Sequence, residues 1–188
     1  MRPALLIPCL LTLAAGTARA GELDLNLGLQ ATTTQWEADH GGGPTLTGTW
    51  FFRDWIGASF TGKEQYATID DRYLSYFSVN AVFRKSWDRV RVAGALGLVH
   101  QHEEPGTVVD SMPVESLFGV ADGIRHRAGS RAGLQLAVPI RDRAHGDWYI
   151  AFDLDATAFA EDTRGPRWMS SAGLSLGFTH DFAQAAPR

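Results

Sequence analysis

Two histidines and a glutamate stand at alternate positions in the stretch His100-Gln-His-Glu-Glu104. If this stretch is extended, His100, His102 and Glu104 share one face, because successive side chains of a strand point to opposite faces. Imidazole nitrogens and carboxylate oxygens are ligands for divalent metals. The spacing therefore predicts a metal site at these three residues, which Asp110 would be able to join. The ordinary alternative is a set of solvated polar side chains.

A second kind of chemistry needs a serine nucleophile, a histidine base and an acid that orients the histidine. Ser170 and Ser171 lie in a predicted strand near the end of the chain, and His100 or His102 would be the base. No sequence motif of a serine hydrolase links these residues. A hydrolase is therefore an alternative interpretation, and no residue is assigned as catalytic.

The elements that would position these residues follow a period of two. Leucines at positions 23, 25, 27 and 29 alternate with polar residues, which predicts a strand with one apolar and one polar face. The alternation recurs along the chain in runs of roughly the 9–11 residues that a tilted membrane strand needs. The predicted strands cover residues 22–32, 45–53, 55–63, 73–84, 89–101, 131–140, 148–158 and 169–182.

Residues 1–20 have the composition of a cleavable secretory leader. Arg2 supplies a positive charge, residues 4–15 are apolar, and Ala18-Arg-Ala20 is a cleavage motif. The only cysteine, Cys9, lies in this leader, so the exported chain is predicted to hold no disulfide and no thiol. Without the leader the chain has 15 basic and 21 acidic side chains. This net charge of −6 argues against a nucleic-acid partner.

An exported chain of such strands is typical of a transmembrane β-barrel in a bacterial outer membrane. Short connections at 53–54 and 85–88 alternate with longer ones at 36–44 and 64–72, as in barrels with short periplasmic turns and longer surface loops. Aromatic residues are predicted to form two girdles at the membrane boundaries. One girdle would hold Trp50, Phe52, Trp55, Phe83, Trp87, Trp148, Phe178 and Phe182, and the other Trp36, Tyr66, Tyr73, Phe159 and Trp168.

These features resemble the small opacity-type and OmpX-type outer-membrane barrels. The resemblance is carried by Val92-Ala-Gly-Ala-Leu-Gly-Leu-Val99 and by the closing Gly173-Leu-Ser-Leu-Gly-Phe-Thr-His-Asp-Phe182, an alternating last strand that ends in Phe. It implies an all-β, antiparallel up-and-down transmembrane barrel of residues 21–182, inserted by the barrel-assembly machinery. The chain departs from the pattern in a short tail, residues 183–188.

Eight strands place both chain ends in the periplasm, and ten strands are the alternative. The count depends on residues 116–124, which lie in a predicted surface excursion, 102–130. A strand at 116–124 would make the count odd, so we favour a helix, with Ser111 as its cap. The helical spacing is that of Leu117, Val120, Ala121 and Ile124.

The interior of an eight-stranded barrel is only wide enough for side chains. Charges on the polar strand faces would pair there, because an unpaired buried charge is costly. We therefore expect a plugged lumen, with a narrow ion path as the alternative. The inward charged set is predicted to be Asp24, Arg53, Lys63, Arg84, Arg91, Arg131, Asp153, Asp155 and Asp181.

A barrel pattern without a catalytic motif favours a monomer that binds surface partners, or stabilises the envelope, through its outer loops. Arg125 and Arg127 would bind phosphates of lipopolysaccharide, which arginine holds bidentately. Glu103 and Asp110 would bind cations that bridge to the same phosphates. The expected partners are outer-membrane lipid and an extracellular ligand, and no cofactor is predicted. The alternatives are a lipid-modifying hydrolase at the outer rim and a narrow channel.

Overall fold

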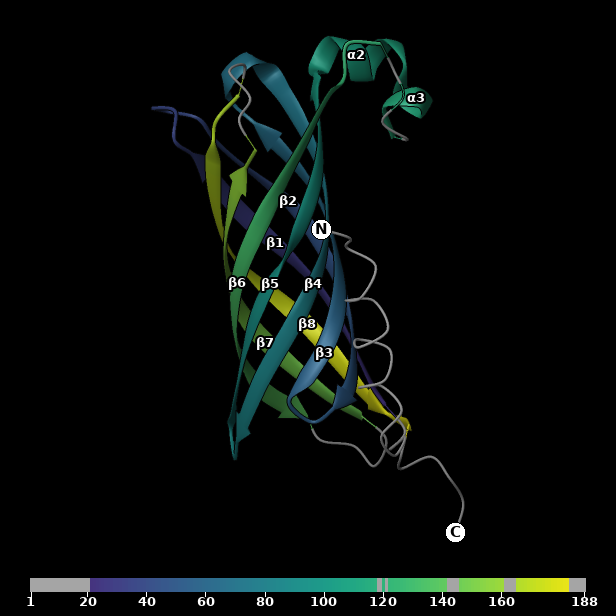
Figure 1. The fold of residues 1–188 in the computed structure, drawn as a ribbon, viewed down its shortest axis with the longest axis vertical. Helices are drawn as coiled ribbons and strands as arrows, with labels where there is room; N and C mark the ends of the chain where they lie inside the picture. The colour runs from purple at the N-terminus through teal and green to yellow at the C-terminus, as the bar shows by residue number, and fades with distance from the viewer. Residues whose placement is uncertain (1–20, 118–119, 121, 142–145, 161–164, 183–188) are drawn as a thin grey trace, which may run out of the picture.

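The computed structural model describes residues 21–117, 120, 122–141, 146–160 and 165–182, so the predicted leader and tail lie outside the described residues. The described residues form eight strands, each antiparallel to its neighbours, and the pairing of the first strand with the last closes a barrel (Figure 1). The strands are β1 (Glu22–Thr34), β2 (His40–Arg53), β3 (Ile56–Ala67), β4 (Arg72–Trp87), β5 (Val90–Pro105), β6 (Arg125–Arg141), β7 (Gly146–Phe159) and β8 (Trp168–Asp181).

All eight predicted strands are present, and the ten-strand alternative is wrong. Each strand runs further than its alternation predicted, mostly at one end. β6, for example, begins at Arg125 rather than at residue 131, and β5 continues to Pro105. The apolar pattern marks only the part of a strand that has an oily outer face, whereas the hydrogen-bonded ladder continues past it with polar residues on both faces.

The two ends of the barrel differ. The turn end has two-residue connections at 54–55 and 88–89, and it is where β1 begins and β8 ends. The loop end has the connections 35–39, 68–71, 106–124 and 160–167, of which 68–71 includes the 3-10 helix η2 (Ile69–Asp71). This alternation of short and long connections is the one that the sequence predicted.

The connection from β5 to β6 carries two short helices, α2 (Gly106–Ser111) and α3 (Pro113–Leu117), which stand beyond the barrel wall (Figure 1). We call residues 106–124 the excursion; it is shorter than the predicted 102–130 because both flanking strands extend into it. The helical interpretation is confirmed as far as Leu117 but is wrong beyond it, since Val120 and residues 122–124 are not helical. Ser111 ends α2 instead of capping the next helix, and its hydroxyl donates to the carbonyl of Thr107 at 2.9 Å.

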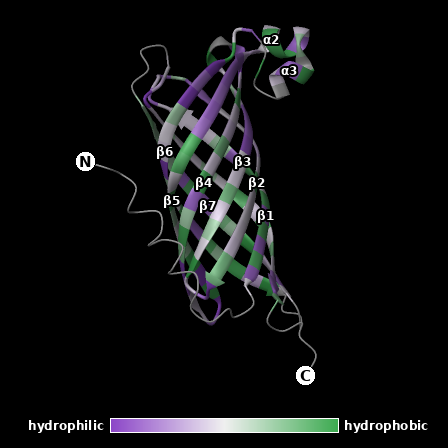
Figure 2. Cartoon of the chain, turned by 45° about the vertical axis from the view of Figure 1, so that its right-hand side comes forward, coloured by the Kyte–Doolittle hydropathy of each residue, from purple (hydrophilic) through white to green (hydrophobic). Residues whose placement is uncertain are grey.

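The barrel is apolar outside and polar inside. Leu27 and Leu98 are 61% and 74% exposed, whereas inward residues such as Asn80 and Thr61 are buried. Figure 2 shows the hydrophobic residues concentrated on the barrel wall towards the turn end and more hydrophilic residues towards the loop end. Such a continuous apolar outer surface is expected where lipid, and not water, surrounds the strands. Among the described residues, no helix is long and apolar enough to cross a membrane.

The aromatic residues follow the predicted girdles with two exceptions. Phe159 is 8% exposed and lies inside the barrel, where the Arg127 guanidinium sits 3.9 Å from the centre of its ring. Trp36 is half-buried, with the Arg72 guanidinium 5.2 Å from its ring centre. Position along the strand placed Phe159 correctly at the loop end, but the period of two turns its side chain inward. The exposed girdle residues are Trp50, Phe52, Trp55, Phe83, Trp87, Trp148 and Phe182 at the turn end and Tyr66, Tyr73 and Trp168 at the loop end. Phe178, also predicted for the turn-end girdle, lies beside Trp148 and is half-buried.

Candidate functional site

Paired charges fill the middle of the lumen. Lys63 Nζ lies 2.5 Å from Asp155 Oδ2, and both side chains are almost completely buried. Arg131 reaches the same carboxylate oxygen at 3.7 Å. Beside them, the hydroxyls of Tyr76 and Thr157 are 3.0 Å apart and bridge β4 to β7 across the interior. Strands on opposite sides of the barrel are therefore joined by polar contacts.

A second group of charges lies towards the turn end, around Asp24. Its carboxylate accepts hydrogen bonds from the hydroxyls of Tyr149 and Thr179, and it pairs with Arg91 Nη2 at 2.9 Å. Nearby, Arg84 holds both carboxylate oxygens of Glu22, with Nη2 at 2.8 Å from Oε2. These contacts pair two carboxylates of β1 with guanidinium groups of β4 and β5.

The third group lies at the loop end, around Glu103. Its carboxylate pairs with the guanidinium groups of Arg72 and Arg125, and Arg127 Nη1 is 3.7 Å away. Arg72 also holds Asp39 at 2.8 Å. The carboxylate of Glu103 is only 2% exposed, so one buried anion balances cations from β4 and β6. A small cavity of about 60 Å³, lined by both polar and apolar residues and nearer the turn end, remains in the described part of the lumen.

The predicted inward charged set is mostly confirmed. Arg53 is the exception: it is exposed, because it ends β2 at an irregularity in the pairing with β3, where the alternation stops. The sequence did not predict the inward charged residues that lie beyond the ends of the predicted strands. Extending the period of two by a few residues along β4 and β5 would have found Arg72 and Glu103. The confirmed members include Asp24, Lys63, Arg84, Arg91, Arg131 and Asp155, all of which form the lumen ion pairs.

The predicted surface-binding residues are divided between the lumen and the surface. Glu103 and Arg127 are 3% and 4% exposed and lie within the barrel mouth, so they are not the freely exposed charges that the sequence suggested. Arg125 keeps a quarter of its side chain exposed while it pairs with Glu103. Asp110 is exposed on α2. Whether any of the four binds a partner remains a prediction.

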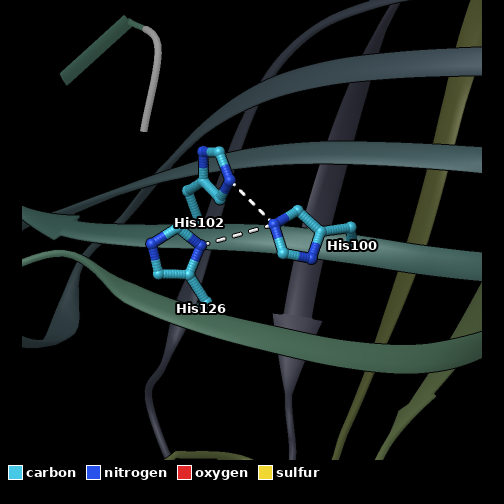
Figure 3. Close-up of side chains that lie close together, drawn as sticks. All are labelled: His100, His102 and His126. Atoms are coloured by element: carbon cyan, nitrogen blue, oxygen red, sulfur yellow. Dashed lines mark hydrogen bonds between the residues drawn. The ribbon is translucent and has the colours of Figure 1, made fainter. Parts of the chain in front are cut away.

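Three histidines meet on the outside of the barrel wall at the loop end (Figure 3). His102 on β5 pairs directly with His126 on β6, and His100 lies two residues along β5 on the same outward face. Directly opposed side chains in a sheet have Cβ atoms about 5 Å apart, so the register itself brings these rings together. The Nε2 atoms of His100 and His102 are 2.9 Å apart, and Nδ1 of His126 is 3.4 Å from Nε2 of His100.

Glu104 does not join the three histidines. It shares their outward parity, but its pairing partner is Tyr73 on β4, and the group of ligand atoms that converge consists of His100, His102 and His126. The sequence therefore predicted two members of the cluster correctly. In place of His126 it predicted Glu104, which lies on the same strand as the other two. His126 was missed because its proximity depends on the register between β5 and β6 across the excursion, which the sequence does not reveal.

The residues of the hydrolase alternative are not brought together. Ser171 is buried inside the barrel, where its hydroxyl is 2.9 Å from that of Thr32. The histidines lie on the outer side of the wall. Ser170 does face outward, but through β7 it is level with Ala132 on β6. His100 pairs with Ala128 and His102 with His126, so the two candidate bases lie four and six residues from that level, or about 13 and 20 Å along the strands.

Sequence comparison finds no match to a known protein family or to a curated protein. Solved structures do match. Neisserial surface protein A is 10% identical, with a TM-score of 0.58 over 86% of this chain and 97% of that one. The attachment invasion locus protein Ail of Yersinia pestis is 16% identical, with a TM-score of 0.52 over 85% and 99%. OprG of Pseudomonas aeruginosa is 10% identical, with a TM-score of 0.51 over 86% and 96%.

These matches agree with the observed strand count and connectivity. The chain has the fold of the small eight-stranded outer-membrane barrels, as its resemblance to the opacity and OmpX types implied. At these levels of identity the likeness concerns the fold alone.

Proposed function

We propose that this protein is a bacterial outer-membrane barrel whose lumen is closed to ions and whose loop end, facing the cell exterior, carries its activity as a surface-binding or envelope-stabilising element. The observation that carries the proposal is the set of buried ion pairs at three levels of the lumen, of which Lys63–Asp155 and Arg91–Asp24 join strands on opposite sides of the barrel. With the interior occupied, the parts left to meet a partner are the loop end and the excursion.

The closed lumen predicts an electrically silent protein. Reconstituted in planar lipid bilayers at neutral pH, it is expected to give no stepwise currents, because eight strands leave an interior that side chains fill. A porin of 16 strands, reconstituted in the same way, is the positive control. Reproducible current steps from the pure protein would instead support the narrow-channel alternative.

The excursion is the part of the loop end best suited to reach a partner. Val114 and Val120 are 63% and 71% exposed on it, and Asp110 and Glu115 are exposed beside them. The segment thus presents apolar and acidic side chains together to whatever lies outside the barrel. Ail, in the structure named above, is described as an attachment invasion locus protein. We extend to this chain only the general idea of a role at the cell surface.

Replacing residues 107–122 by a short Gly-Ser linker is expected to leave the barrel folded and to abolish the surface role. Adhesion of expressing cells to matrix-coated surfaces and their survival in serum and detergent would be compared among the wild type, the linker variant and a deletion strain. The linker variant is expected to match the deletion strain. Labelling of Ser111→Cys on intact cells by a membrane-impermeant maleimide is the control for orientation. Wild-type behaviour of the linker variant would remove the excursion from the proposal.

A further inference from the structure

The three histidines occupy an unusual place for polar side chains. A polar row runs across the outer face of four neighbouring strands, through Glu64, Ser75, His102 and His126, each paired with the next. The row lies two residues from Tyr73, a member of the loop-end aromatic girdle. On the other side, towards the turn end, the outward side chains of β5 are Leu98 and Leu96. The histidines therefore stand at the boundary between the apolar band and the polar loop end.

The geometry of the cluster is that of a ligand set. One nitrogen from each ring lies within 4.8 Å of the other two. Around a tetrahedral zinc ion with Zn–N bonds of about 2.0–2.1 Å, two ligand nitrogens are about 3.3–3.4 Å apart. Of the observed separations, 3.4 Å matches that distance, 2.9 Å is shorter, and the third pair lies within 4.8 Å. Figure 3 shows the rings of His102 and His126 both directed towards the Nε2 atom of His100.

His102 is the most buried of the three histidines. Its ring is only 9% exposed, and its Nδ1 atom has no hydrogen-bond partner in the described part of the chain. A buried polar side chain is costly unless its polar atoms are satisfied. The nitrogen that faces the cluster is Nε2, so a cation at the centre would bind Nε2 and leave Nδ1 as the N–H of the ring. Two imidazoles share only one proton between facing nitrogens, whereas a cation at the centre satisfies all three lone pairs.

We propose that His100, His102 and His126 form a binding site for a divalent transition metal, with Zn²⁺ as the best-fitting ion. Imidazole ligands suit zinc, copper and nickel, whereas calcium and magnesium require oxygen ligands. Three histidines with one remaining position, open to water or an anionic oxygen, are a common arrangement for four-coordinate zinc. The site lies on the outer face of the wall, so it does not depend on the proposed closed lumen.

The site would join the two ends of the excursion. His100 and His102 precede it on β5, and His126 follows it on β6. A metal bound to all three therefore clamps the strands at the base of α2, which itself contacts β4 and β5. Zinc binding and the position of the excursion would be linked through this clamp.

The test is a calorimetric titration with Zn²⁺ alone, using refolded barrel protein that carries no polyhistidine tag. The wild type is expected to bind one equivalent. His102→Ala and His126→Ala are each expected to weaken binding by at least about 100-fold, since loss of even an outer-shell partner costs 10–100-fold. His40→Ala, an exposed histidine on β2 outside the cluster, is the matched control and is expected to change affinity by no more than about twofold.

Glu104→Gln separates the structural site from the site that the sequence alone predicted. Because Glu104 lies outside the cluster, this variant is expected to keep wild-type affinity. X-ray absorption of the zinc-loaded wild type would count imidazole ligands without any mutation, and three are expected. The proposal is overturned if the wild type binds zinc no more tightly than His126→Ala, or if the absorption spectrum shows no imidazole at the metal.

Discussion

Replacing Glu103 by alanine is expected to lower the free energy of unfolding by about 3–5 kcal/mol, the usual cost of removing one partner from a buried ion pair. The reason is the number of cations that this one carboxylate balances. Arg72 and Arg125 pair with it directly, and Arg127 approaches it at 3.7 Å. Without Glu103, Arg72 keeps its contact with Asp39, but the three guanidinium groups lose the carboxylate that they share, and they cannot lose their charge at ordinary pH.

Equilibrium unfolding in lipid vesicles, followed by the fluorescence of the six tryptophans, measures this effect. Glu115→Ala, on the exposed surface of α3, is the matched control, and it is expected to stay within about 0.5 kcal/mol of the wild type. A Glu103→Ala variant as stable as the control would mean that the loop-end cations are neutralised by something other than this carboxylate.

The second large effect concerns the pair at the centre of the lumen. Lys63→Met is expected to destabilise the barrel by about 3–5 kcal/mol, because it leaves the buried Asp155 carboxylate, among the described residues, with only the longer cation contact to Arg131. The double variant Lys63→Met with Asp155→Leu is expected to recover at least half of that loss. Replacing both members of a buried pair by apolar residues of similar size removes the desolvation cost together with the attraction.

A double-mutant cycle at these two positions measures the interaction directly, with the two single variants, the double variant and the wild type unfolded under one set of conditions. Strict additivity of the single effects would show that Lys63 and Asp155 do not depend on each other. In that case the lumen would hold a set of independent polar residues, and the proposed closure of the lumen would need another explanation.

The strands were predictable from sequence because lipid and lumen impose opposite polarity on alternate residues. This signal covers the membrane band, so all eight strands were found but their loop-end extensions were not. Arg72 and Glu103 fell in those extensions. Phe159 was assigned to the girdle because it is aromatic, and this was wrong for a related reason. It belongs to the alternate residues of β7 that face the lumen, so its side chain lies against Arg127.

The histidine cluster shows where a sequence-based prediction stops. His100 and His102 share a strand, and a period of two is enough to put them side by side. His126 stands on the next strand, and it meets them only because β5 and β6 pair in one particular register after a connection of 19 residues, 106–124. Neither the alternation nor the composition of that connection encodes the register.

The pairing of β1 with β8, which closes the barrel, has a consequence for the order in which the barrel folds. Asn26 bonds to Ser175, 149 residues away, and Asp24 bonds to Thr179, 155 residues away. None of these contacts can form until β8 has reached the barrel. Until then the polar face of β1 lacks these hydrogen-bond partners. Contacts so distant in sequence make folding slow. The nascent chain is thus most exposed to misfolding and proteolysis before closure, the interval in which an assembly factor would protect it.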